Sequence, residues 1–275
     1  MNKEIIINFC PTGMIPRKEN TEFVPISPEE IIEQTHEAYE VGITIVHLHA
    51  RLNDGTPTYK KSYYQKIFEG VRKYCPDLVI CASTSGRDFP EFEKRSEVIE
   101  LKPDMCSLTL SSLNFHNQAS VNQPKTIVRL AEKMNQYGVT PELECFDLGM
   151  INYGKYLIKK GIISGPIYWN FLFGNIAGFQ SSFSHLGLAL SEINPNDFVG
   201  FGGLGQYQLP INSAAIAMGY GVRVGIEDNI WWDLSKTKKV KNIELIKRIH
   251  LLIELNQKQF LEPKHFGDTG FYNKK

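Results

Sequence analysis

The fold is decided by the stretch Ile43-Thr44-Ile45-Val46-His47-Leu48-His49, a short and almost continuously apolar segment. Apolar runs of this length are typical of parallel strands that are covered on both faces. Seven similar runs occur along the chain, with amphipathic stretches between them. The eight predicted strands are Ile5–Cys10, Ile43–His49, Leu78–Ser83, Met105–Leu110, Glu142–Phe146, Ile167–Phe173, Phe198–Gly202 and Val222–Ile226.

The amphipathic stretches between the runs predict helices. The first, Pro28–Val41, has Ser27 as its N-cap, proline at its first position and two acidic residues in its first turn. Glycines stand where helix C-termini are expected, at Gly138, Gly161 and Gly219. The remaining predicted helices are Tyr59–Tyr74, Phe89–Leu101, Pro124–Tyr137, Gly149–Lys160, Gly178–Leu190, Pro210–Gly219 and Ile243–Leu255.

Eight strands that alternate with helices in 275 residues predict an α/β fold, the (β/α)8 TIM barrel. A doubly wound open sheet is the alternative. No linker, low-complexity segment or charge block divides the chain, so we expect residues 1–275 to form a single (β/α)8-barrel domain.

The composition excludes several classes of partner. Thirty basic and thirty acidic side chains cancel, and no basic stripe is present, so nucleic acid is not expected to bind. No apolar run approaches the ~20 residues of a membrane span, and the N-terminal segment does not fit a signal peptide. Without CxxC spacing, the five cysteines are expected to be buried small hydrophobes in a reducing compartment, which predicts a cytoplasmic protein.

The strongest local signal for chemistry is the pair His47 and His49. Residues two apart on a strand point to the same face, so both imidazoles project together at the C-terminal end of the second strand. In a barrel this end carries the active site, and two imidazoles can share a metal ion, most often zinc. The motif alone is equally compatible with a hydrogen-bonded pair of core histidines.

Three charged residues mark the eighth strand and the loop that follows it. Arg223 lies on the strand, and Glu227 and Asp228 come directly after it. Because the eighth strand of a closed barrel neighbours the first, Glu227 is expected to face the two histidines across the barrel mouth. Two histidines and one glutamate with an open position form a known catalytic zinc site.

The fifth strand carries two carboxylates on one face, Glu142 and Glu144. A carboxylate inside a barrel is costly unless it is paired, ligated or used. Glu144 lies nearer the C-terminal end and is the better site candidate, whereas Glu142 is expected one layer deeper, in a structural role. Hydroxyl-rich loops after the third and fourth strands are weaker candidates for substrate contacts.

Two glycine-rich segments follow the sixth and seventh strands, at residues 173–178 and 200–205. The second resembles a dinucleotide-binding motif, but no βαβ unit with a downstream acid accompanies it. Loops after strands seven and eight of barrels often hold phosphate, so a phosphate group near Leu209-Pro210 is plausible. Trp231 and Trp232, just past the expected site, suit either an interface or a cap over the pocket.

Taken in order, these segments resemble the β-keto acid cleavage enzyme family, whose best-known activity is 3-keto-5-aminohexanoate cleavage. The resemblance covers nearly the whole chain. It rests on the segments CPTGMIP (10–16), VPISPEEI (24–31), VHLHARLNDG (46–55), STSG (83–86), KPDMCSLTLSSLNF (102–115), PELECFDLGM (141–150) and VRVGIEDN (222–229).

The resemblance implies a zinc-dependent (β/α)8 barrel with one Zn2+ per chain that assembles as a homo-oligomer, usually a tetramer. It implies that a β-keto acid and acetyl-CoA react to give acetoacetyl-CoA and a second acyl-CoA-type product by Claisen and retro-Claisen steps. The residues that match metal ligands are His47, His49 and Glu227; those that match catalytic groups are Asp228, Arg223 and Glu144; and the expected substrate contacts are Ser83, Ser107 and Thr12.

Among the catalytic groups, Asp228 is expected to be the base that takes the C2 proton, oriented by Arg223, with Glu144 as the alternative base or proton shuttle. Two other functions remain open from the sequence. One is a metal-dependent aldolase or hydrolase that acts on a small keto acid without CoA, and the other is a ligand-binding barrel without catalysis.

The chain also departs from the family pattern. The loop Thr12–Pro16 lacks the acidic residue with which some relatives hold a substrate amino group, so 3-keto-5-aminohexanoate is not the expected substrate. Arg17 and Lys18 follow this loop and suit a neutral or anionic distal group. STSG, GNIAG (174–178) and Gln206 also differ from the family pattern, which affects the expected CoA contacts rather than the metal site.

Overall fold

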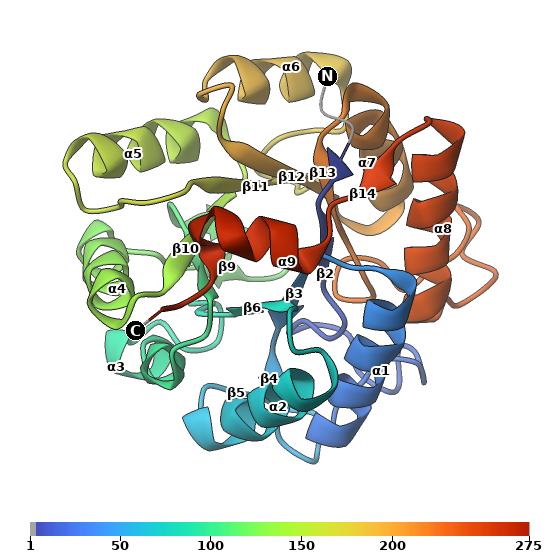
Figure 1. Cartoon of the computed structure of the whole chain (residues 1–275), viewed down its shortest axis with the longest axis horizontal. Coiled ribbons are helices and arrows are strands. Elements are labelled where there is room, and N and C mark those ends of the chain that lie inside the picture. The colour runs from blue at the N-terminus through green and yellow to red at the C-terminus, as the bar shows by residue number, and fades with distance from the viewer. Residues whose placement is uncertain (1–3, 275) are drawn as a thin grey trace.

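Eight parallel strands close into a barrel in the computed structural model, which describes residues 4–274 (Figure 1). Strand order around the barrel follows chain order, and pairing of Arg223 with Asn8 belongs to the register that closes the ring. The TIM barrel expected from the sequence is therefore confirmed, and the open doubly wound sheet is excluded. The strands are β2 (Ile7–Phe9), β3 (Ile45–Leu48), β6 (Val79–Ala82), β7 (Met105–Thr109), β10 (Thr140–Cys145), β11 (Tyr168–Phe173), β12 (Phe198–Gly203) and β13 (Gly221–Val224).

Helices surround the barrel, and most begin close to the predicted positions. At the first helix, the Ser27 hydroxyl accepts a hydrogen bond from Glu30 N and the Glu30 carboxylate accepts one from Ser27 N, both at 3.1 Å. Gly138 and Gly219 end two helices in the left-handed conformation, as predicted. The outer helices are α1 (Pro28–Val41), α2 (Lys61–Tyr74), α4 (Pro124–Tyr137), α5 (Leu148–Lys159), α6 (Phe183–Ser191), α7 (Gln208–Met218, preceded by the 3-10 turn η2, Gly205–Tyr207) and α8 (Asn242–Leu255).

The predicted helix Phe89–Leu101 is wrong as a continuous element. The segment forms a short helix α3 (Phe92–Arg95) and a 3-10 turn η1 (Val98–Leu101). Arg95 explains the break, because its buried guanidinium donates to Thr84 O at 2.7 Å and to Asn122 Oδ1 at 2.8 Å. These contacts with two other loops fix the local backbone. The spacing of apolar residues along the segment, from which the helix was predicted, contains no information about them.

The N-terminal end of the barrel is closed by the C-terminal segment of the chain. Helix α9 (Pro263–Phe266) lies across this end, followed by the π-helical turn η3 (Gly267–Phe271) (Figure 1). Phe266 and Phe271 stack with ring centroids 4.1 Å apart and pack with Tyr168 and Phe198, the first residues of two barrel strands. Nearby, β1 (Glu4–Ile5) pairs with β14 (Gln259–Phe260).

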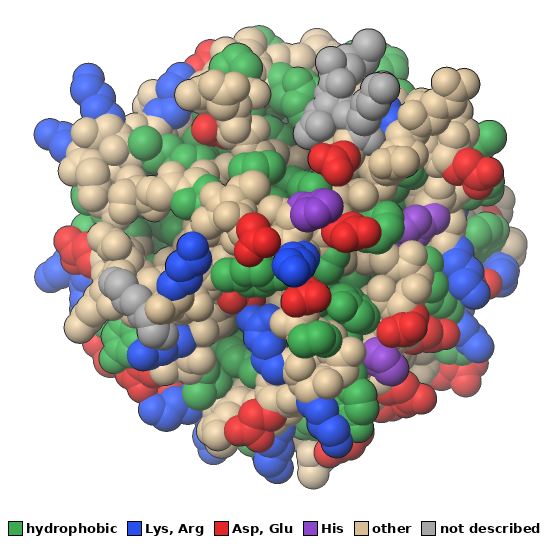
Figure 2. Space-filling model, in the orientation of Figure 1, with side chains coloured by type: hydrophobic (Ala, Val, Ile, Leu, Met, Phe, Trp, Pro, Cys, Tyr) green, Lys and Arg blue, Asp and Glu red, His purple; other side chains and the backbone are tan. Residues whose placement is uncertain are grey.

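The face that α9 covers carries acidic and basic side chains interspersed with apolar ones, and neither sign forms a continuous patch (Figure 2). This distribution agrees with the balanced composition. Among residues 4–274, no helix is both long and apolar enough to cross a membrane.

Two small hairpins follow barrel strands on the opposite side, where the strands have their C-terminal ends. The pair β4 (Ala50–Arg51) and β5 (Pro57–Thr58) comes after β3, and the pair β8 (Leu113–Asn114) and β9 (Ala119–Ser120) comes after β7. All five cysteines are buried and free, as predicted.

The packing of α9 leads to a stability prediction. Phe266→Ala should lower the free energy of unfolding by about 3–5 kcal/mol, because it removes a fully buried ring that closes the barrel. Urea unfolding followed by circular dichroism measures the change. The control Leu251→Ala removes a half-exposed side chain on α8 and should change stability by less than about 0.5 kcal/mol. Equal stability of the two variants would contradict the role of α9 as a plug.

Candidate active site

A cavity of about 230 Å³ lies at the C-terminal ends of the barrel strands. Its walls combine side chains that are far apart in the sequence, because the ends of parallel barrel strands meet at one face. The polar residues that line it are His49, Ser83, Ser85, Arg87, Thr109, Ser120, Glu144, Arg223, Glu227 and Asp228. Most of the predicted site residues therefore meet in one cavity.

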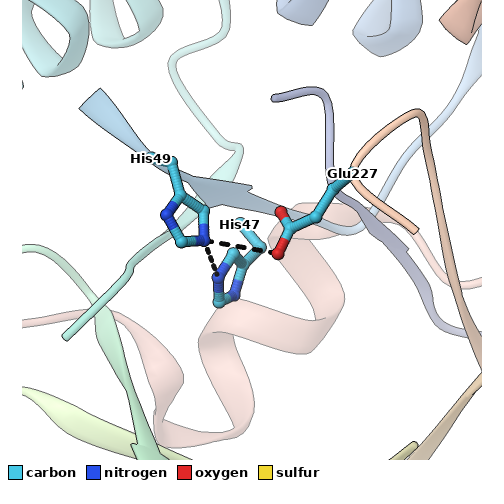
Figure 3. Close-up of side chains that lie close together, drawn as sticks. All are labelled: His47, His49 and Glu227. Atoms are coloured by element: carbon cyan, nitrogen blue, oxygen red, sulfur yellow. Dashed lines mark hydrogen bonds and ion pairs between the residues drawn. The ribbon is translucent and has the colours of Figure 1, made fainter. Parts of the chain in front are cut away.

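The two histidines and Glu227 converge as the strand geometry predicted (Figure 3). His47 is on β3, His49 directly follows it, and Glu227 lies in the turn after β13. Nε2 of His47 is 3.3 Å from Nε2 of His49, which in turn is 3.3 Å from Oε1 of Glu227. One possible ligand atom from each residue thus lies within 4.8 Å of the others.

A fully buried carboxylate orients His47. Oε2 of Glu142 lies 2.7 Å from Nδ1 of His47, which places the imidazole proton on Nδ1 and leaves the lone pair of Nε2 directed toward His49. Burial alone would lower the pKa of His47, but the Glu142 carboxylate outweighs it and raises the pKa. Asn8 and Asn170 donate to the other oxygen of Glu142 at 2.6 and 2.9 Å. Glu142 is therefore a deeper, positioning group, as the strand pattern suggested.

These residues fit a divalent metal ion. Burial lowers the pKa of His49, which favours the neutral imidazole that a metal requires. Oε2 of Glu227 is buried and has no hydrogen-bond partner among residues 4–274, so this oxygen is free to act as a ligand. A set of two imidazoles and one carboxylate suits zinc and leaves a position open for substrate.

Arg223 joins three carboxylates at the edge of this cluster. Its guanidinium donates to Glu227 Oε1 at 2.6 Å and to Asp228 Oδ2 at 2.9 Å. A longer ion pair of 3.6 Å reaches Glu144 Oε1. A single buried cation therefore fixes a metal-ligand candidate and both base candidates in one arrangement.

The three carboxylates differ in their pKa values. Burial raises the pKa of Glu144, and the neighbouring Glu142 carboxylate raises it further, against the lowering effect of Arg223. Burial also raises the pKa of Asp228, although Arg223 again acts in the opposite sense. For Glu227, burial would raise the pKa, but Arg223 and the two histidines hold it well below its usual range. Glu227 thus remains ionised, as a metal ligand would have to be, whereas the carboxyls of Glu144 and Asp228 hold a proton more readily than usual.

The three predicted substrate contacts occupy different positions. Ser83 follows β6 and lines the cavity. Ser107 does not line it: its hydroxyl accepts a hydrogen bond from Thr84 N at 3.1 Å, one layer below the cavity wall. Thr12 is fully buried, and its hydroxyl has no partner among residues 4–274.

Several residues at the site were not singled out from the sequence. Thr109, at the end of β7, lines the cavity in the position expected of Ser107 and donates to Glu144 Oε2 at 2.7 Å. Arg51 donates to Gly13 O at 2.6 and 3.0 Å and so holds the loop after the first barrel strand. Gly13 is required there, because a Cβ on it would approach Glu227 Cγ to 2.4 Å and its φ is +64°.

The region past the eighth strand does not cap this cavity. Trp231 and Trp232 line a separate cavity of about 110 Å³, together with Gln206 and Leu209. Neither tryptophan is among the residues that line the cavity beside His49 and Glu227, so the cap expected as one alternative is not formed among the described residues. A surface role at an interface remains the other prediction.

Comparison with known proteins gives consistent matches over most of the chain. A family model described as beta-keto acid cleavage enzyme matches residues 4–266. A 3-keto-5-aminohexanoate cleavage enzyme from Fusobacterium nucleatum subsp. nucleatum is 36% identical over 252 residues, covering 90% of this chain and 91% of the relative. A 3-oxoadipate:acetyl-CoA acetyltransferase from Cupriavidus necator is 33% identical over 257 residues, covering 92% and 90%.

Among solved structures, a binary complex of ObcA with oxaloacetate matches with a TM-score of 0.79 at 17% identity. The match covers 91% of this chain and 68% of that one. At this level of identity the likeness supports the barrel fold alone.

The metal site leads to a direct test. His47→Ala should reduce bound zinc to background and leave the barrel folded, because barrel stability and mouth chemistry are largely separate. Zinc is measured by mass spectrometry after loading and gel filtration, and folding by circular dichroism. His265→Ala, an exposed histidine on α9 at the opposite end, should keep full zinc. Full zinc content in a folded His47→Ala variant would refute the ligand assignment.

Proposed function

Because the chain belongs to the β-keto acid cleavage enzyme family, we propose that it is a zinc-dependent acyltransferase that reacts a β-keto acid with acetyl-CoA. The names of relatives at 33–36% identity support both reactants. The observation that carries the proposal is the link made by Arg223. It joins Glu227 of the metal cluster to two carboxylates of raised pKa in the same cavity.

The balance of the reaction corrects the products expected from the sequence. A single CoA enters, so a single thioester leaves, and acetoacetyl-CoA together with a second acyl-CoA does not balance. Bond formation between C2 of the keto acid and the acetyl carbonyl releases CoA thiolate. Attack of this thiolate on C3 breaks the C2–C3 bond and gives acetoacetate and the acyl-CoA of the distal part.

The first step needs a base beside C2 of the substrate. Asp228 lines the cavity, and burial raises its pKa, which makes its carboxylate a stronger base than an exposed one for the C2 proton. The bond from Arg223 Nε fixes the orientation of its carboxylate. A zinc ion held by His47, His49 and Glu227 would supply Lewis acidity that stabilises the negative charge left on the substrate.

To Glu144 we assign a second proton-transfer role. Thr109 donates to one of its oxygens and Arg223 lies near the other, so the carboxylate is held at the cavity wall. The C2 carbanion of the departing acetoacetate takes up one proton. We assign the delivery of this proton to the protonated form of Glu144, after which the proton that Asp228 took from the substrate passes back to Glu144 or is exchanged with solvent. Ser83 lines the same cavity, and we assign its hydroxyl to a hydrogen bond with a substrate oxygen.

The reaction type is tested with a panel of β-keto acids. Product should form only when both zinc and acetyl-CoA are present, because the acyl group of the substrate needs CoA as its acceptor. Mass spectrometry detects acetoacetate and the new acyl-CoA together. Cleavage at the same rate without acetyl-CoA would instead favour the aldolase or hydrolase, and no turnover across the panel would favour a non-catalytic barrel.

The base assignment makes a separate prediction. Asp228→Asn should lower kcat by about 10²–10⁴-fold, the usual contribution of a general base, and leave zinc content unchanged. The specific readout is exchange of the C2 protons with D2O in the absence of acetyl-CoA, followed by NMR. Glu144→Gln should retain this exchange and lose turnover. The opposite pattern, with exchange lost only in Glu144→Gln, would transfer the role of base to Glu144.

A further inference from the structure

One cation of the active-site cavity takes no part in the chemistry proposed above. Arg87, in the loop after β6, lines the same cavity as Arg223 and Glu227. Arg223 makes ion pairs with three carboxylates, whereas Arg87 makes none with any residue between 4 and 274. Its Nε is buried and lacks a hydrogen-bond partner within the same described range.

The guanidinium of Arg87 is held in place without a direct ion pair among the described residues, although nearby carboxylates, with Glu227 and Asp88 foremost, favour its charge from a distance. Its Cζ lies 3.6 Å from the centroid of the Phe115 ring, which supports one face of the group. The Gln118 side chain donates to Arg87 O at 3.0 Å and to Asp88 Oδ1 at 3.1 Å, which fixes the loop to the β8–β9 hairpin. Burial lowers the pKa of Arg87 from its ordinary value. A desolvated donor left unpaired is costly, so a ligand that pairs with it gains affinity.

The side chains around Arg87 indicate the chemistry of the substrate part that would bind beside it. The same cavity is lined by a group of apolar side chains, Met14, Ile15, Leu113, Phe115, Phe146 and Leu172. None of these can pair with an amino group, and Met14 and Ile15 belong to the loop that lacks an acidic residue. An apolar wall with one cation fits a short methylene chain that ends in an anion.

We infer that Arg87 binds a second carboxylate at the distal end of the keto acid, which makes the substrate class the β-keto dicarboxylic acids. The inference rests on the function proposed above, because it needs the first carboxylate and the keto group at the metal cluster. A guanidinium binds a carboxylate through two parallel hydrogen bonds, so the planar fork of Arg87 suits this group.

The competing ligand for Arg87 is the co-substrate. A neighbouring cavity of about 570 Å³ shares Arg87, Ile15, Phe115 and Leu204 with the active-site cavity, so Arg87 lies where the two meet. A phosphate or carbonyl of CoA could reach it from that side. The inner cavity, at about 230 Å³, has the size for a small acid and is below the ~300–1,000 Å³ typical of pockets for larger ligands.

The test compares two acids of equal length, 3-oxohexanedioate and 3-oxohexanoate, which has a methyl group in place of the distal carboxylate. The zinc-loaded enzyme should prefer the dicarboxylate in kcat/KM. Arg87→Met should reduce kcat/KM for the dicarboxylate by about 10–150-fold, the effect of one lost charged hydrogen-bonding group. The values for 3-oxohexanoate and the KM for acetyl-CoA should stay within about threefold. Arg87→Lys keeps the positive charge but loses the planar pair of donors, so its kcat/KM for the dicarboxylate should lie between those of the unmodified enzyme and Arg87→Met.

A matched control is available on the outside of the barrel. The Cζ of Arg129 lies 3.7 Å from the centroid of the Phe92 ring, the same kind of contact as that of Arg87 with Phe115, but away from the cavity. Arg129→Met should therefore leave the preference between the two acids unchanged. Loss of preference in both variants would mean that a general loss of arginine stacking, rather than a carboxylate contact, explains the result, and would overturn the inference.

Calorimetric binding of both acids without acetyl-CoA separates this inference from the proposed reaction. Tighter binding of the dicarboxylate that Arg87→Met abolishes supports the inference even if no acetyl-CoA-dependent product forms, a result that would overturn the proposed function alone. Equal binding of the two acids to the unmodified enzyme would overturn the inference. A rise in the KM for acetyl-CoA alone would also overturn it, because Arg87 would then serve the co-substrate.

Discussion

The interaction on which the site depends is the buried carboxylate of Glu142, which joins side chains from four other strands inside the barrel. It accepts hydrogen bonds from Asn8 on β2, Cys81 on β6 and Asn170 on β11, and it meets Nδ1 of His47 on β3. A charge with no exposure is tolerated only where its lone pairs are satisfied in this way. Glu142 thus orients His47 directly, and the imidazole of His49 lies 3.3 Å from that of His47 and from the Glu227 carboxylate.

Above Glu142, one arginine, Arg223, is paired with several carboxylates whose pKa values differ. Arg223 is the common partner of Glu227, Asp228 and Glu144, yet these acids do not titrate alike. The pKa of Glu227 is held low by Arg223 and the histidines, whereas burial prevails for the other two and raises the pKa of each. A metal ligand must stay ionised and a base must be able to take a proton, so one cation supports both needs through differences in environment.

The barrel could be predicted from the sequence because eight apolar runs alternate with helices, and that pattern has few solutions. The convergence of His47, His49 and Glu227 followed, since β3 and β13 both flank β2 and all strands of a barrel have their C-terminal ends at one face. The break in the segment after β6, residues 89–101, could not be predicted, because Arg95 is held by Thr84 and Asn122, which lie in loops outside that segment. The plug formed by α9 was also missed, as a four-residue helix carries no measurable periodicity.

Within the site, the positions of residues on strands could be predicted from the sequence better than those of residues in loops. The period of two along β10 places Glu142 and Glu144 on one face, and their order along the strand gives the depth of each: Glu144, nearer the C-terminal end, lines the cavity, and Glu142 lies below it. On β7 the period of two places Ser107 and Thr109 on one face, so it does not show which of them reaches the cavity. The register does: Thr109 pairs with Glu144 at the level of the cavity. No periodicity predicts the position of Arg87, since it lies in a loop whose shape depends on contacts with Gln118 and Phe115 of the β8–β9 hairpin. Strands thus fix the groups common to the reaction, and loops, which tolerate more change, set the group that meets the variable end of the substrate.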